Sequence, residues 1–90
     1  MKTAFRQVSL TTTVEAEEAV GVVMQGVFRV VPSVFTHPES QNPVVSVYLP
    51  QQQTVTVANK QAVDDGLKTI RKCGLQVGVG KLEIKWLRRE

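Results

Sequence analysis

Cysteine, aromatic residues and long apolar runs are scarce in this chain of 90 residues. The single cysteine, Cys73, excludes an internal disulfide and a zinc site built from several cysteines, and it indicates a reducing compartment such as the cytoplasm. The apolar stretch at residues 27–31 is interrupted by Arg29 and ended by Pro32, so it is far too short to span a membrane. The amino-terminal residues lack the apolar block of a secretory signal. We therefore expect a cytoplasmic protein without a membrane partner.

Charge of one sign is also in short supply. The formal net charge is +3, and no basic run is longer than a pair such as Arg88-Arg89. A nucleic-acid footprint would have to be assembled in space, so nucleic acid is not the expected partner. The composition, 42% hydrophobic and 21% charged, is ordinary for a globular chain. We expect residues 1–90 to form one domain whose helices and sheet share a single core.

Alternation of apolar and polar residues with a period of two predicts four strands. They span Ala4 to Thr11, Ser33 to His37, Val44 to Leu49 and Lys81 to Leu87. The turn over residues 38–43 is polar and bracketed by prolines, which predicts a hairpin between the second and third strands. The side chains expected to face the core are Val8, Leu10, Val45, Val47, Leu49, Leu82, Ile84 and Trp86.

A first helix is predicted after the first strand. Thr12 and Glu15 have the spacing of a capping box, and Pro32 places the end of the helix near Phe28 to Val31. The β-branched valines and two glycines of this segment lower helix propensity, so a strand is the competing interpretation. The cap, the early acidic residues and the spacing of the apolar residues favour the helix. Its expected buried stripe is Ala16, Val20, Val23 and Val27.

A second helix is predicted from about Lys60 to Lys72, with Asn59 as its N-cap. The preceding segment, residues 51–57, is predicted to be a loop, with a short strand as the alternative. Gly74 suits the left-handed position that ends many helices. The inward stripe is Val63, Leu67 and Ile70.

The order strand, helix, strand, strand, helix, strand predicts a ferredoxin-like α+β sandwich. Right-handed crossovers give a four-stranded antiparallel sheet with the spatial order 4-1-3-2 and both helices on one face. The other face of the sheet is left open for binding.

No arrangement of residues predicts catalysis. His37 is the only histidine, and a lone histidine beside Glu39 at a loop edge is interpreted as a surface residue. Cys73 is interpreted as a buried or half-buried thiol that closes the second helix. The run Gly78-Val79-Gly80-Lys81 lacks both the earlier glycine and the following hydroxyl residue of a phosphate-binding loop. The expected catalytic, cofactor-binding and metal-binding residues are therefore none.

Two aromatic residues bear on nucleic-acid binding, because exposed aromatics on an open sheet are the stacking platform of RNA-recognition modules. Tyr48 is predicted to point outward and Trp86 into the core. The segment Val44 to Tyr48 lacks the basic residue, glycines and paired aromatics of that class. The metal-chaperone version of the fold is excluded because Thr11-Thr12-Thr13 stands where two cysteines are required.

Three stretches together resemble the N-terminal domain of the ribosomal protein methyltransferase family that modifies the stalk-base protein of the large ribosomal subunit. They are Glu15 to Val20, Val47 to Pro50, and Cys73 to Gly78 with Lys81 to Lys85. The resemblance implies a small ferredoxin-like domain that recognises the protein substrate, followed by a linker and a separate S-adenosylmethionine-binding domain. This sequence ends at Glu90, about where the family continues with an Asp-Trp pair, and the family's methyltransferase domain is absent from it. No catalytic or cofactor residue is carried over.

We therefore expect a substrate-recognition domain that binds a ribosomal protein, either excised from a methyltransferase or free-standing. The expected partner-binding residues are Phe35, His37, Tyr48, Lys81 and Lys85. The alternative is a regulatory domain of the amino-acid-sensing type, against which the lack of a glycine at the turn 11–13 argues. A weak homodimer and an RNA-binding sheet also stay open.

Overall fold

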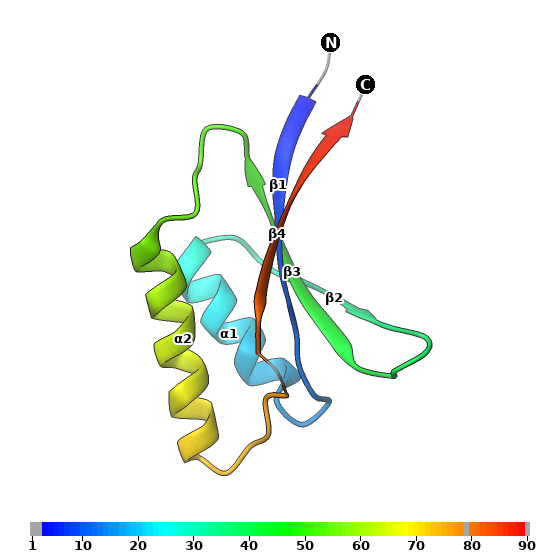
Figure 1. The fold of residues 1–90 in the computed structure, drawn as a ribbon, viewed down its shortest axis with the longest axis vertical. Coiled ribbons are helices and arrows are strands. Elements are labelled where there is room, and N and C mark those ends of the chain that lie inside the picture. The colour runs from blue at the N-terminus through cyan, green and yellow to red at the C-terminus, as the bar shows by residue number, and fades with distance from the viewer. Residues whose placement is uncertain (1–2, 79, 90) are drawn as a thin grey trace.

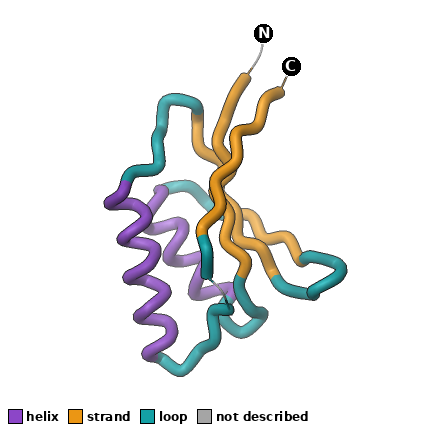
Figure 2. The backbone as a smooth tube through the Cα atoms, in the orientation of Figure 1, coloured by secondary structure: helices purple, strands orange, loops and turns teal. Residues whose placement is uncertain are grey.

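The computed structural model describes residues 3–78 and 80–89, and the predicted order of elements is confirmed (Figure 1). The elements are β1 (Thr3–Thr11), α1 (Glu17–Phe28), β2 (Ser33–Thr36), β3 (Pro43–Pro50), α2 (Val57–Lys72) and β4 (Leu82–Arg89). The strands form one antiparallel sheet in the order β2-β3-β1-β4. Both helices lie on the same side of this sheet (Figure 2). This is the ferredoxin-like α+β arrangement predicted from the sequence.

One core lies between the sheet and the two helices. The central strands β1 and β3 contribute alternate residues, as their period-two pattern predicts, and the helices contribute residues spaced three or four apart. Each of these side chains is at most 7% exposed. They include Val8, Leu10, Val45, Val47 and Leu49 from the strands and Val20, Met24, Phe28, Val63, Leu67 and Ile70 from the helices.

The predicted capping box of α1 is wrong. The helix begins at Glu17, and its N-cap residue, Ala16, has no side-chain cap. Thr12 is 2% exposed and its hydroxyl donates to the carbonyl of Val77 at 3.1 Å, and the residue lies a full turn before the start of the helix. The helix ends where Pro32 predicts, because Arg29 adopts a left-handed conformation (φ 61°) and donates its N–H to Gln25.

The buried stripe of α1 is also shifted from the predicted one. Met24 and Phe28 are buried, whereas Val23 and Val27 are only partly buried against the core. The four-residue spacing from Ala16 through Val20 continues to these larger side chains. Val23 instead faces α2, which packs along that flank of α1.

The start of α2 is the second correction. The helix begins at Val57, and Thr56 is its N-cap. The Thr56 hydroxyl accepts from the Asn59 N–H at 3.0 Å, and the Asn59 side chain accepts from the Thr56 N–H at 3.0 Å. Asn59 is thus the third residue of the helix and the second member of a capping box. The preceding loop and the left-handed Gly74 (φ 89°) are confirmed.

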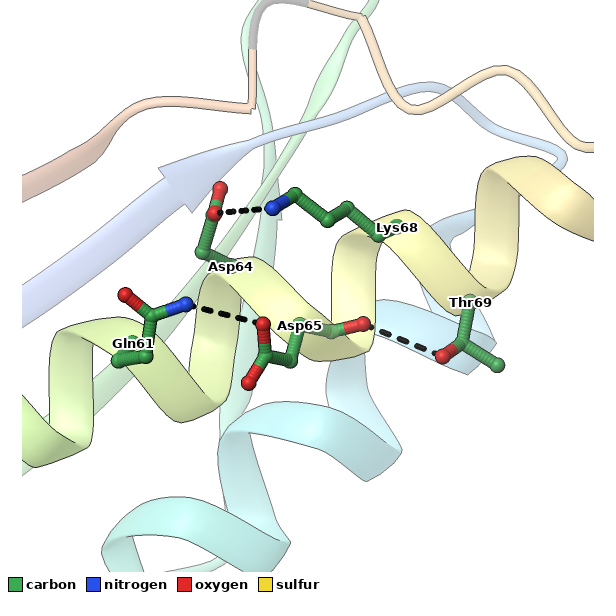
Figure 3. Close-up of polar contacts among 5 residues, drawn as sticks. All are labelled: Gln61, Asp64, Asp65, Lys68 and Thr69. Atoms are coloured by element: carbon green, nitrogen blue, oxygen red, sulfur yellow. Dashed lines mark hydrogen bonds and ion pairs between the residues drawn. The ribbon is translucent and has the colours of Figure 1, made fainter.

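The outer face of α2 carries polar contacts in solvent (Figure 3). Gln61 donates to Asp65 at 2.9 Å, and Lys68 lies 3.5 Å from Asp64. The Thr69 hydroxyl donates to the Asp65 carbonyl at 3.1 Å. These residues lie in the middle of the helix, and its first turn holds no acidic residue.

The expected burial of Ile84 and Trp86 in the core is wrong, although the predicted side of the sheet is right. Both lie on the helix side of the sheet, opposite Val8 and Arg6, yet they are 40% and 55% exposed. Both residues lie on an edge strand, and the carboxyl-terminal half of β4, which holds Trp86, extends past both helices (Figure 1). The Arg6 guanidinium lies 4.2 Å from the centre of the Trp86 ring, a cation–π contact that replaces burial.

Two smaller expectations are corrected at the ends of elements. Cys73, interpreted as a thiol at least half buried, is exposed where α2 ends. His37, predicted as the last residue of the second strand, lies just after β2 in the hairpin. Its backbone N–H donates to the Asn42 carbonyl, and its carbonyl accepts from the Gln41 N–H.

Candidate protein-interaction face

The face of the sheet turned away from the helices carries alternate residues of all four strands. The strand registers place Gln7 opposite Tyr48 on β3 and opposite Lys85 on β4. These three residues form a row across β3, β1 and β4, and adjacent strands are about 4.8 Å apart. An aromatic ring, an amide and an ammonium group therefore stand side by side on this face.

Direct contacts hold the Tyr48 end of this row. The Gln7 side-chain amide donates to the Tyr48 hydroxyl at 3.3 Å. The ring of Phe5 meets the Tyr48 ring edge to face, with centroids 5.9 Å apart and an interplanar angle of 65°. Tyr48 is nevertheless 44% exposed. We call Phe5, Gln7, Tyr48 and Lys85 the open-face cluster.

Phe35 stands on the same face but apart from the open-face cluster. It pairs with Val44, which lies four residues before Tyr48 on β3, and it is 61% exposed at the edge of the sheet. It adds an apolar contact near the hairpin end of the face.

The remaining predicted partner-binding residues lie outside the open-face cluster. His37 is in the exposed hairpin, where its Nδ1 accepts from the Glu39 N–H at 3.3 Å. Lys81 is exposed just before β4, four residues from Lys85. Of the five predicted residues, the structure brings only Tyr48 and Lys85 into one group.

Two members of the open-face cluster were not among the predicted site residues. Gln7 was assigned to the outward face of its strand, but its role depends on the register that joins it to Tyr48. Phe5 matters only because Tyr48 lies diagonally across from it. The strand order 4-1-3-2 was the sequence signal from which this row could have been inferred.

The cluster is suited to binding and contains no proton-transfer pair. Over residues 3–78 and 80–89, no group of three or more histidine, cysteine or acidic side chains is arranged to hold a metal ion. Within the same ranges, no helix combines the length and apolar character needed to cross a membrane.

Comparisons of the chain with protein-family models, curated proteins and solved structures found no match.

Proposed function

We propose that this chain is a substrate-recognition domain that holds a ribosomal protein for an S-adenosylmethionine-dependent methyltransferase. In this proposal the chain positions its partner, and methyl transfer takes place on a separate domain. The particular target, the stalk-base protein of the large subunit, is inferred from the resemblance of three stretches of the sequence.

The open-face cluster is the observation that carries the binding function. Residues that dominate protein–protein affinity are enriched in tyrosine and other large side chains that combine apolar area with a polar group. Tyr48 has this character, and Phe5 and Gln7 hold its ring in place before a partner arrives. A side chain that is already ordered loses less conformational entropy on binding.

Two of the stretches that carry the resemblance meet in the structure. The Gln76 N–H donates to the Glu15 carboxylate at 3.3 Å, and the hydroxyl of Thr13, just before Glu15, donates to the Gln76 carbonyl. These residues join the turn before α1 to the loop before β4. Their contribution is to the fold, and the open-face cluster lies on the other side of the sheet.

The test is a nuclear magnetic resonance titration of the labelled chain with the stalk-base ribosomal protein. We expect shifts of the amides of Gln7, Tyr48 and Lys85. Tyr48→Ala should weaken binding about tenfold or more, because truncating such an anchor costs upwards of about 1.4 kcal/mol.

The matched control is Val57→Ala. Val57 is 82% exposed at the start of α2, away from the open face, and its truncation should leave the affinity unchanged. Circular dichroism of each variant establishes that it is folded. Equal weakening by the two substitutions, or no shift with the folded chain at high concentration, would contradict the proposal.

The amino-acid-sensing alternative has no structural contact in its favour. At the turn between β1 and α1, the hydroxyls of Thr12 and Thr13 are both engaged with carbonyls of the loop before β4. A thermal-shift screen against amino acids separates the two functions, because a ligand that binds the native state raises its melting temperature. Clear stabilisation by an amino acid, without binding of the ribosomal protein, would replace the first proposal by this one.

A further inference from the structure

A groove of about 500 Å³ lies between the outer flank of α1 and the segment that leads into β2. Four valines line it, from the turn before α1, from α1 itself and from the entry to β2. Val14, Val22, Val31 and Val34 are 73%, 68%, 75% and 48% exposed. Exposed apolar side chains gathered in one hollow mark an interaction site more often than isolated ones do.

The groove is acidic, although the chain as a whole is basic. Glu15, Glu17 and Glu18 line it, and no lysine, arginine or histidine within residues 3–78 and 80–89 does. Among the residues that the structure describes, none of these carboxylates forms an ion pair with a basic side chain. The helix dipole accounts for acidic residues at the start of α1. It does not account for four exposed valines beside them.

The strand that borders the groove has a free edge. β2 pairs only with β3, and all four of its residues are exposed. Val34 pairs with Val45 and so lies on the helix side of the sheet, beside α1. A strand added to the outer edge of β2 would likewise place every second side chain on the helix side, over the groove.

We propose that an extended, basic segment of the protein partner binds along β2 as a fifth strand. Its backbone pairs with the edge of β2, and the side chains turned to the groove are apolar against the valines and basic against the glutamates. This mode of binding combines backbone hydrogen bonds with pockets for alternate side chains. The inference rests on the proposed recognition function and names the segment that the partner supplies.

An extended segment fits this place better than a helix does. A helix in the groove would leave the outward N–H and C=O groups of β2 without backbone partners, whereas a strand pairs with them. The order of the lining residues, with glutamates at the start of α1 and Val22 and Val31 further along, requires both kinds of side chain on the same face of the bound segment.

Synthetic peptides test this arrangement directly. The probe has threonine at alternate positions and the order Val, Val, Lys, Lys at the others, and its sequence-reversed form covers the opposite strand direction. We expect one of the two to shift the amides of Val31 and of residues 33–36 and to bind more weakly as salt is raised. The same peptide with glutamate in place of lysine should bind at least tenfold more weakly.

A pair of variants locates the charge effect. The double substitution Glu17→Gln and Glu18→Gln should weaken binding of the lysine peptide about three- to tenfold, since ion pairs at exposed positions contribute only modestly. Glu83→Gln on β4, at the opposite edge of the sheet, is the matched control and should change nothing.

The outcomes separate this inference from the proposed function. If the ribosomal protein binds the wild-type chain and the double variant equally, the groove is not used and the inference fails while recognition stands. If residues 31–36 shift with rising concentration of the chain alone, the occupant is a second copy and the inference is overturned. Equal binding of the lysine and glutamate peptides also overturns it. If the peptide binds but the ribosomal protein does not, the groove is confirmed as a site for a basic strand, and the ribosomal protein is wrong as the partner.

Discussion

Gly66 lies where the two helices touch, and its missing side chain makes the contact feasible. A Cβ atom at this position would lie 2.7 and 2.8 Å from the two γ-carbons of Val23 on α1. A glycine inside a helix costs about 1 kcal/mol relative to alanine. At Gly66 the close approach of α1 and α2 offsets that cost.

We predict opposite effects of alanine at two helical glycines. Gly66→Ala should destabilise the fold by about 1–3 kcal/mol, because overpacking outweighs the gain in helix propensity. A Cβ atom added at Gly26 would meet no described atom within 4 Å outside its own stretch of helix. Gly26→Ala should therefore stabilise the fold by up to about 1 kcal/mol. Urea unfolding gives both values.

The double variant Gly66→Ala with Val23→Ala is the control for this pair. It should lose less stability than the sum of its single changes, since the second substitution removes the clashing atoms. A stabilising Gly66→Ala would show that the helices can move apart freely, contrary to this packing.

Single residues show where sequence patterns reach their limit. The period of two assigns Trp86 to the correct side of the sheet, but it does not say how far along that side the helices extend. The contact between Gly66 and Val23 joins residues 43 positions apart and leaves no local signal. The alternation predicts which face of the sheet a side chain lies on, whereas tertiary packing decides whether a helix covers it.

The starts of the two helices show that the same residue spacing can lead to different caps. The pairs Thr12 with Glu15 and Thr56 with Asn59 have the same spacing, yet only the second forms a capping box. The Thr12 side chain is buried against the Val77 carbonyl, and α1 begins only at Glu17, so Thr12 lies too early in the chain to cap the first turn. The spacing alone does not decide where a helix begins, because the segment after Thr12 runs through a turn before α1 starts at Glu17.

Removing the true cap should weaken α2. We expect Thr56→Ala to cost about 1 kcal/mol, because the N–H of Asn59 loses its acceptor. Thr54→Ala, at an exposed threonine of the preceding loop, is the matched control and should stay within about 0.5 kcal/mol of wild type. Thermal unfolding monitored by circular dichroism compares them. Equal losses of stability in the two variants would show that the Thr56 side chain is not the cap of α2.

Across the whole molecule, the turn between β1 and α1 is joined to the loop before β4. Thr12 and Val77 are 65 residues apart, and their hydrogen bond is buried. This contact connects the first strand–helix–strand unit to the end of the second one. It therefore stabilises the packing of the two units against each other more than the structure of either unit by itself.

We predict that Thr12→Val destabilises the molecule by about 1–3 kcal/mol, because the buried Val77 carbonyl loses this donor. Thr69→Val removes a hydroxyl that also donates to a carbonyl, but in an exposed position on α2 (Figure 3). It should cost less than about 0.5 kcal/mol. Denaturant unfolding of both variants provides the measurement, and similar losses would contradict a special role for the buried contact.

The candidate surfaces could be predicted only in part. Strand order and alternation place Tyr48 and Lys85 on the open face, and both were expected there. The groove beside β2 combines Val22 of α1 with Val31 and Val34 across the following turn. Its shape depends on how α1 lies against the sheet edge, which no periodicity in the sequence specifies.

The pairing of β1 with β4 brings the two described ends of the chain together, since Thr3 pairs with Arg89 (Figure 1). Hydrogen bonds between antiparallel strands run perpendicular to the strands. A force that separates these ends therefore acts along the hydrogen bonds and breaks them one after another, starting from the pair Thr3 and Arg89. Tension applied through the termini peels β4 away first, so under mechanical load this domain yields at a force well below that needed to slide two strands past each other.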